Sequence, residues 1–285
     1  MTPTRTLTAN CTLSQDGLPL LTIDKEHARA EISLFGAHVL RYQRHGLPAS
    51  LWLSDKAILD GSKPIRGGIP LCWPWFGPSP ARVGSGKPAH GFARNCLWTL
   101  DGVSDHGDGT LVHLSLRDND ASRTLWPHAF ELELDVLVGK ELSLVLTTRN
   151  TGKSALTYNA ALHTYLQISA PEAVTVTGLG EPYLDKLTGR NELQQGALTV
   201  TAAMDRIYRQ PDAMVSVQDG ERTTRVVNGN HDSVVVWTPW QEGASAMADM
   251  SDDGYRTMLC VEAAITAEDG ITVPPDEEHS FSTVI

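Results

Sequence analysis

The chain is poor in the features that mark several classes of protein. It has four cysteines among 285 residues, and they are scattered: Cys11, Cys72, Cys96 and Cys260. A disulfide scaffold carries a denser set and a zinc site carries clustered ligands, so we interpret these four as reduced thiols of the core. No stretch is apolar over the length that a membrane-spanning helix requires.

Basic residues are fewer than acidic ones. Lysine and arginine total 23 against 34 aspartates and glutamates, which gives a formal net charge of −11. Nucleic acids and anionic membranes are bound by basic surfaces, so this balance argues against both as partners. A small anionic substrate remains compatible with it, because a pocket can be basic within an acidic protein. Residues 1–13 lack the apolar core of an export signal, and we expect a cytoplasmic monomer.

Helical patterns are nearly absent. No window of about a dozen residues repeats apolar side chains at the helical period, and only residues 55–59 and 183–187 suggest short helical turns. Strict alternation is frequent instead. It is clear over residues 111–117 and 130–138, and it continues over 142–146 after a turn at Gly139–Lys140.

Further short β-rich runs are spread along the second half of the chain. They lie at residues 173–177, 198–202, 214–217, 224–227 and 233–237. Alternating strands between regular turn signals are typical of an antiparallel sandwich. The sequence therefore predicts an all-β protein, and the absence of linkers or repeats predicts one domain over residues 1–285.

The longest irregular stretch runs from about residue 62 to residue 88 and is dense in glycine, proline and tryptophan. Long loops inside a compact domain are often functional. Trp73, Trp75 and Phe76 lie in it. They offer flat faces on which a sugar ring could lie, or they form a hydrophobic plug at one end of the sandwich.

Two arginines lie in segments that contain glycine. Arg66 precedes Gly67 and Gly68, which permit a sharp turn or close approach of the backbone to a ligand. Arg94 lies in the segment HGFARN at residues 90–95. Arginine binds carboxylate or phosphate through two parallel hydrogen bonds. The pair therefore indicates either an anion site or two ordinary surface ion pairs.

One carboxylate interrupts an apolar run. If residues 258–265 form a strand, Glu262 shares one face with Met258 and Cys260, and the other face is apolar. Burial disfavours a charged carboxylate and raises its pKa, which suits a general base that works near neutral pH. The pattern leaves two readings open: a catalytic base, or a strand-end carboxylate paired with an arginine.

A histidine lies in a similar setting. His163 and Tyr165 share one face of residues 161–166, and imidazole titrates closer to physiological pH than any other side chain. A lone histidine in a strand is more often structural than catalytic, and the chain has ten histidines. The pattern makes His163 a candidate acid–base group.

The chain resembles the hexose-6-phosphate mutarotases, also described as glucose-6-phosphate 1-epimerases, the phosphosugar branch of the aldose 1-epimerase superfamily. The resemblance spans residues 36–263 and rests on six segments in order: PIRGGIPLCWPWFGP, AHGFARN, LHTYL, MDRIY, VVVWTPW and CVEAA. It implies an antiparallel β-supersandwich of the galactose-mutarotase type. It also implies an isomerase that needs no cofactor and no metal.

The resemblance also implies roles for individual residues. His163 matches the catalytic acid and Glu262 the catalytic base. Arg66 and Arg94 match basic substrate-binding positions, which we expect to hold the phosphate. Some relatives carry glutamine where this chain has Ala89, so one substrate contact is absent or supplied elsewhere.

Two more positions are expected in the substrate pocket. Asp205 matches a sugar-binding carboxylate, and His90 belongs to the pocket-lining motif. The implied reaction interconverts the α and β anomers of a hexose 6-phosphate, with glucose 6-phosphate as the expected substrate. The base removes the proton of the C1 hydroxyl, the acid protonates the ring oxygen, and the ring closes again after rotation about the C1–C2 bond.

Three alternatives share the predicted fold. A mutarotase of unphosphorylated aldoses is the nearest, although that branch carries an NHTYF-like segment where this chain reads ALHTYL. A non-catalytic carbohydrate-binding protein would not need a desolvated glutamate that faces a histidine. A glycoside hydrolase or lyase would need different groups, since hydrolases use two carboxylates that flank the scissile bond.

Overall fold

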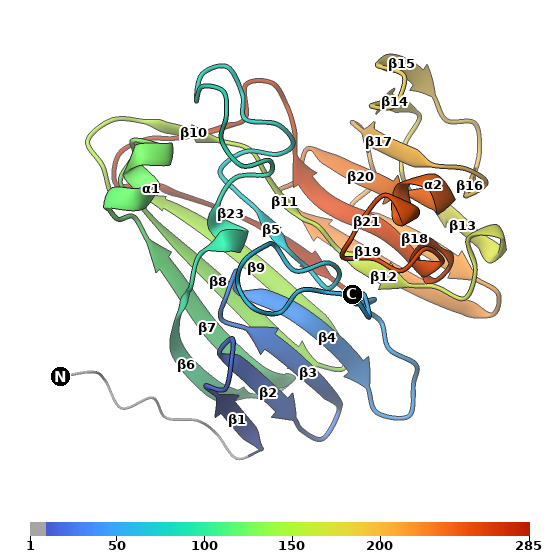
Figure 1. The fold of residues 1–285 in the computed structure, drawn as a ribbon, viewed down its shortest axis with the longest axis horizontal. Helices are drawn as coiled ribbons and strands as arrows, with labels where there is room; N and C mark the ends of the chain where they lie inside the picture. Colours follow the sequence, from blue (N-terminus) through green and yellow to red (C-terminus); the bar gives the residue numbers. More distant parts are fainter. Residues whose placement is uncertain (1–9) are drawn as a thin grey trace.

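The computed structural model describes residues 10–285, which fold mainly into antiparallel strands (Figure 1). Most of the N-terminal segment considered for an export signal lies outside the described residues. The largest sheet has nine strands. In spatial order they are β16 (Leu198–Thr199), β13 (Val174–Thr177), β18 (Met214–Asp219), β19 (Arg222–Gly229), β23 (Glu278–Val284), β9 (Leu142–Asn150), β8 (Phe130–Gly139), β7 (Gly109–Arg117) and β6 (Thr99–His106).

A second sheet has eight strands and will carry the candidate site. Its order is β15 (Arg190–Leu193), β14 (Pro182–Asp185), β17 (Met204–Tyr208), β20 (Ser233–Thr238), β21 (Met258–Ile265), β11 (Ala160–Leu162) and β5 (Leu71–Cys72), with β12 (Tyr165–Gln167) also paired to β21.

Two smaller sheets complete the strands of the described residues. One contains β1 (Cys11–Ser14), β2 (Leu20–Asp24), β3 (Ala28–Ser33) and β4 (His38–Arg44), and the other contains β10 (Leu156–Tyr158) and β22 (Ile271–Val273). The blue strands β1–β4 cover the green strands β6–β9 in Figure 1.

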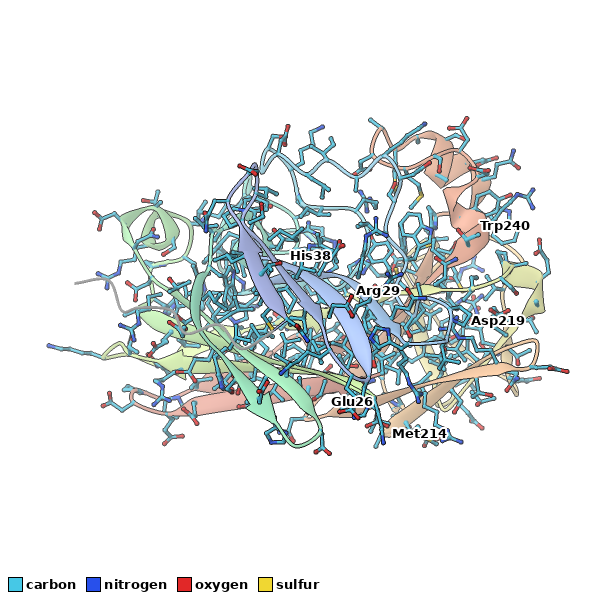
Figure 2. All side chains as sticks on the ribbon, turned by 90° about the horizontal axis from the view of Figure 1, so that it is seen from below. Glu26, Arg29, His38, Met214, Asp219 and Trp240 are labelled. Atoms are coloured by element: carbon cyan, nitrogen blue, oxygen red, sulfur yellow. The ribbon has the colours of Figure 1, made fainter. Side chains whose placement is uncertain are left out.

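The nine-stranded sheet is covered by different partners along its length. Apolar side chains of β1–β4 and β6–β9 form one core. A second core lies between β13, β18 and β19 of the nine-stranded sheet and β17, β20 and β21 of the eight-stranded sheet. Side chains fill the space between these layers, as the turned view in Figure 2 shows. The predicted antiparallel sandwich is confirmed.

The alternation seen in the sequence becomes strand faces. Val112, Leu114 and Leu116 of β7 are buried, while the residues between them are partly exposed. The turn after Gly139 joins β8 to β9 as an antiparallel hairpin, in which Val138 pairs with Leu142. These predictions are therefore confirmed.

The two predicted helical turns are wrong. Residues 55 and 56 form a turn and residues 57–59 have no regular structure, while residues 182–185 form strand β14, whose backbone bonds to β15 and β17 on its two sides. The short helices of the described residues are α1 (Asp120–Leu125), α2 (Trp240–Ser245), and the 3₁₀ turns η1 (Ala93–Asn95), η2 (Pro171–Ala173) and η3 (Gly254–Thr257). None of the described helices is long and apolar enough to cross a membrane.

Three of the four cysteines are buried, as expected for core thiols: Cys11, Cys72 and Cys260. Cys96 is only partly buried, next to η1, so for this residue the expected core position is wrong. Its place in a surface turn rather than in a strand explains the difference.

Candidate active site

A cavity of about 480 Å³ contains all six residues singled out in the sequence as site candidates. They are Arg66, His90, Arg94, His163, Asp205 and Glu262. Its volume lies in the range of small-molecule pockets, about 300–1,000 Å³. The segments that supply these residues are far apart in the chain, and the fold brings them to one place.

The cavity lies on the outer face of the eight-stranded sheet. Leu259 and Val261 of β21 point into the core between the two large sheets. Cys260 and Glu262 alternate with them and therefore point to the opposite face. Loops cover that face, so all of β21 is buried and Glu262 is only 1% exposed. The predicted strand with both faces covered is confirmed.

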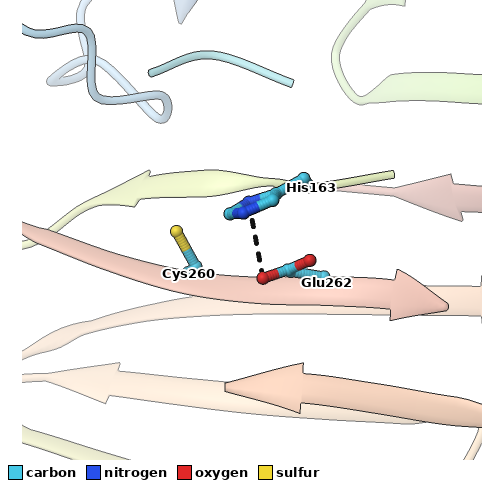
Figure 3. Close-up of side chains that lie close together, drawn as sticks. All are labelled: His163, Cys260 and Glu262. Atoms are coloured by element: carbon cyan, nitrogen blue, oxygen red, sulfur yellow. Dashed lines mark ion pairs between the residues drawn. The ribbon is translucent and has the colours of Figure 1, made fainter. Parts of the chain in front are cut away.

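His163 lies opposite Glu262 across two paired segments. Leu162 pairs with Ala263 and Tyr165 pairs with Cys260, and this register places position 163 against position 262. Nδ1 of His163 is 3.4 Å from Oε1 of Glu262 (Figure 3). The sequence singled out both residues separately, and the sheet makes them neighbours.

Aromatic rings hold the imidazole of His163 in place. The ring of Tyr165 stacks on it with centroids 4.9 Å apart and an interplanar angle of 8°. Trp237 meets it edge-on at 6.1 Å. The backbone N–H of His163 donates to the carbonyl oxygen of Pro70. The ring can therefore change its protonation state with little change of position.

Burial favours the neutral form of both members of the pair. It raises the pKa of Glu262 well above its usual range, and the charge of Asp205 adds to the shift while Lys186 and Arg94 oppose it. Burial also lowers the pKa of His163, with further contributions from His90, Arg94 and Arg66. Both shifts favour the form in which the proton of the pair lies on Glu262 rather than on His163.

A tight turn presents Arg66 to the cavity. Gly67 and Gly68 have φ angles of +112° and +63°. A Cβ atom on Gly68 would lie 2.2 Å from the carbonyl oxygen of Val39, so only glycine fits there. The predicted sharp turn is confirmed, and the close approach of the backbone at Gly68 is to Val39 of β4.

The guanidinium of Arg66 has two partners. Its Nη1 donates to the hydroxyl of Tyr165 at 3.1 Å. Its Nε and Nη2 lie 3.3 Å and 3.2 Å from Oδ2 of Asp249, which follows α2. These contacts orient the guanidinium at the His163 end of the cavity, because Tyr165 stacks on His163.

His90 and Arg94 come from the HGFARN segment. His90 packs edge-on against Phe76 at 5.0 Å, and its Nδ1 accepts a hydrogen bond from the N–H of Gly77. Burial and the nearby cations lower the pKa of His90 to about 3, so the ring is neutral. Arg94 donates to the carbonyl oxygen of Ala89.

Asp205 forms the Glu262 end of the cavity together with a residue that the sequence did not reveal. The Nζ of Lys186, just after β14, lies 2.7 Å from Oδ2 of Asp205. It also lies over the ring of Phe76, 5.2 Å from the centroid. No motif marks Lys186, because only the pairing of β14 with β17 brings it beside Asp205.

Sequence reasoning also missed Trp237 and Asp249 as lining residues. Trp237 lies within the VVVWTPW segment, but the resemblance implied no role for its ring. Of the three loop aromatics, Trp73 and Trp75 are fully buried and form the expected plug, and only Phe76 reaches the cavity.

The cavity is more basic than the chain as a whole. Its lining contains four cations, Lys63, Arg66, Arg94 and Lys186. It contains three carboxyl groups, Asp205, Asp249 and Glu262, and burial disfavours the charged form of Glu262. Four cations against at most three carboxylates make the pocket suitable for an anion, although the chain carries a net charge of −11.

Cys260 lies beside the pair, and its sulfur, the imidazole and the carboxylate lie within 4.8 Å of one another (Figure 3). Soft metals bind the thiolate form of cysteine. Burial and the neighbouring Glu262 raise the pKa of the Cys260 thiol well above its usual range. The trio therefore fits an acid–base pair beside an inert thiol better than a metal centre.

Comparison with known proteins identifies the family of the chain. The model of the aldose 1-epimerase family matches residues 19–285. A Salmonella typhimurium protein named "Putative glucose-6-phosphate 1-epimerase" is 37% identical over 251 residues, 87% of this chain and 83% of its own. An Escherichia coli protein of the same name is 36% identical over 258 residues, 89% of this chain and 85% of its own.

Solved structures show the same fold. A crystal structure described as a putative mutarotase from Salmonella typhimurium has a TM-score of 0.92 and 32% identity, and the match covers 99% of this chain and 94% of that one. The galactose 1-epimerase of Lactobacillus acidophilus has a TM-score of 0.72 with 98% of both chains covered, and at 14% identity it supports the fold alone. The chain belongs to the aldose 1-epimerase family.

Proposed function

We propose that the protein is an isomerase that interconverts the α and β anomers of a hexose 6-phosphate, with glucose 6-phosphate as the substrate. One observation carries the proposal: a buried histidine faces a buried glutamate inside a pocket with an excess of cations. The names of the relatives agree with this activity. The single-domain organisation, the cytoplasmic location and the monomeric state expected from the sequence remain predictions.

In this proposal Glu262 and His163 perform the proton transfers. The Glu262 carboxylate takes the proton of the C1 hydroxyl while the His163 imidazolium protonates the ring oxygen. The bond between C1 and the ring oxygen breaks and C1 becomes an aldehyde. After rotation about C1–C2, neutral His163 takes back the proton and Glu262 returns its own to the aldehyde oxygen, which closes the ring on the other face.

The number of protons transferred is consistent with the use of the same pair, His163 and Glu262, for ring opening and for ring closure. The pair holds a single proton in either form, on His163 before ring opening and on Glu262 before ring closure. No proton has to be exchanged with solvent during a turnover. The separation of 3.4 Å between Nδ1 and Oε1 is short enough for a small movement to pass the proton directly.

The cations would hold the phosphate. Arg66 and Arg94 provide hydrogen-bond donors with geometry suited to phosphate oxygens. The phosphate is remote from C1, so its binding energy can hold the sugar while the bonds at C1 change. Asp205 is available to the sugar hydroxyls, and Phe76 and Trp237 provide apolar faces in the pocket.

The test is Glu262→Gln, assayed on freshly dissolved α-glucose 6-phosphate by polarimetry and by exchange NMR at equilibrium. We expect kcat to fall by about 10²- to 10⁴-fold, the usual contribution of a positioned acid–base group, with little change in binding. The control is Glu133→Gln, which alters an exposed carboxylate on β8. Wild-type turnover by Glu262→Gln would overturn the proposed role.

A further inference from the structure

The cavity is electrically asymmetric along the line that joins the acid–base pair. At the His163 end, Arg66 bonds to the hydroxyl of Tyr165, whose ring lies flat on the imidazole. At the Glu262 end, Lys186 and Asp205 form a pair in which the two charges offset each other. Arg66, which also pairs with Asp249, therefore lies on the His163 side of the acid–base pair, while Arg94 acts on both residues.

At His163 the neighbouring cations act in the same direction as burial, which is the main cause that favours the neutral imidazole. A guanidinium close to a histidine disfavours the imidazolium, and a site removed from water strengthens the effect. Arg66 and Arg94 both act on His163 in this sense, and His90 adds to them. Arg66 has one anionic partner, Asp249, but no carboxylate offsets Arg94 or Lys63 in this way among the described ion pairs.

The form with the proton on Glu262 is the one that closes rings, whereas ring opening needs the imidazolium. Free protein is therefore held in the wrong form for its cyclic substrate. In a hexose 6-phosphate the phosphate is on C6, and C6 is attached to C5, which carries the ring oxygen. The group that protonates the ring oxygen must therefore lie on the phosphate side of the sugar, next to the cations.

We infer that the phosphate of the substrate also switches the acid–base pair: a dianion against Arg66 and Arg94 moves the shared proton from Glu262 to His163. The phosphate then raises kcat as well as affinity. It follows that a free oxyanion bound in this subsite gives the protein a further activity, the anomerisation of unphosphorylated aldoses. This inference rests on the proposed function and explains how the enzyme selects phosphorylated sugars over unphosphorylated ones.

The experiment supplies the anion separately from the sugar. Freshly dissolved α-glucose is given to the enzyme with and without inorganic phosphite dianion, and anomerisation is followed by polarimetry. The rate without enzyme is subtracted at each phosphite concentration, because oxyanions themselves catalyse mutarotation. We expect saturating phosphite to raise kcat/KM for glucose at least tenfold. Arg66→Gln should abolish the activation, whereas Arg222→Gln, which alters an arginine outside the cavity, should preserve it.

A second measurement does not depend on turnover. In enzyme labelled with ¹⁵N at histidine, His163 is assigned by its loss in His163→Gln, and its ring nitrogens report the protonation state directly. Phosphite should convert the neutral ring to the imidazolium in wild type. Arg66→Gln lacks the guanidinium that disfavours the imidazolium, so its ring should already be charged without phosphite and should not change when phosphite is added. An unchanged ring together with no activation of glucose would overturn the inference.

The two proposals fail in different ways. Absence of activity on glucose 6-phosphate would overturn the proposed function itself. Equal kcat values for glucose and glucose 6-phosphate, or phosphite that only inhibits, would overturn the switch and leave the mutarotase assignment standing.

Discussion

In the proposed mechanism His163 and Glu262 hold one proton between them, and each ring opening or closing step needs both groups. Removal of either residue therefore disables the step that the other would share. Groups that act as a unit show non-additive losses when they are removed. We therefore expect His163→Gln and Glu262→Gln each to reduce kcat by about 10²- to 10⁴-fold. The double variant should be no slower than the slower single variant. Rates from exchange NMR that multiply across the two sites would contradict a coupled pair.

The hydroxyl of Tyr165 is a second test at the residue scale. It accepts a hydrogen bond from Arg66 while the ring stacks on His163. Tyr165→Phe keeps the ring and frees the guanidinium. A lost hydrogen bond of about 0.5–1.5 kcal/mol corresponds to a roughly 2- to 13-fold increase in KM for glucose 6-phosphate, and kcat should change less.

A matched tyrosine provides the control for this variant. Tyr183 donates its hydroxyl hydrogen bond to Glu192 outside the cavity. Tyr183→Phe should therefore leave both steady-state constants at their wild-type values. If Tyr165→Phe behaved in the same way, Arg66 would not depend on Tyr165 for its position.

At the scale of elements, the turn at residues 66–68 links the arginine to the strands beneath it. Gly68 combines a φ of +63° with a Cβ position 2.2 Å from the carbonyl oxygen of Val39. Gly46 has a φ of +76° with no atom within 4 Å of its Cβ position. The two glycines share the backbone strain and differ in the steric clash.

This difference predicts unequal losses of stability. Gly46→Ala should lower the free energy of unfolding by about 1–2 kcal/mol, the cost of a left-handed non-glycine residue. Gly68→Ala should cost at least twice as much, because Val39 must also move. Denaturant unfolding of both variants measures the losses. Equal losses would show that the turn yields to the added methyl group.

At the scale of the whole molecule, stability should fall in mild acid. His38, at the start of β4 and labelled in Figure 2, is buried, and its Nε2 lies 2.7 Å from the carbonyl oxygen of Gly67. Burial lowers its pKa from 6.5 to about 4. Between pH 4 and pH 6.5 the unfolded chain therefore binds a proton at His38 that the folded protein does not bind.

The sign of the effect follows from this difference. The stabilisation is complete above pH 6.5 and is lost as the pH falls toward 4. His38→Gln retains a donor for Gly67 but cannot titrate. We expect the slope of the unfolding free energy against pH to become shallower by up to about 1.4 kcal/mol per pH unit in this range. Parallel slopes for wild type and His38→Gln in urea titrations would show that His38 does not contribute to the loss of stability in acid.

Much of the fold was predictable because alternation is a local property. The strand β21 has the predicted limits and faces, and Glu262 is buried on it as expected. The predicted helical turn at residues 183–187 is wrong because a segment of only five residues has weak local preferences. Its pairing with β15 and β17 decides its structure, and no local pattern encodes that pairing.

The sequence by itself determined which side chains could perform the chemistry: an acid–base histidine, a carboxylate in an apolar strand, and arginines in glycine-containing segments. Only the tertiary structure decided that they act together. The register of β11 and β12 on β21 places His163 against Glu262, and Asp249 reaches Arg66 from 183 residues away. Burial, charge and proton position depend on such distant contacts, because desolvation and Coulomb energies are set by whatever surrounds a group in space.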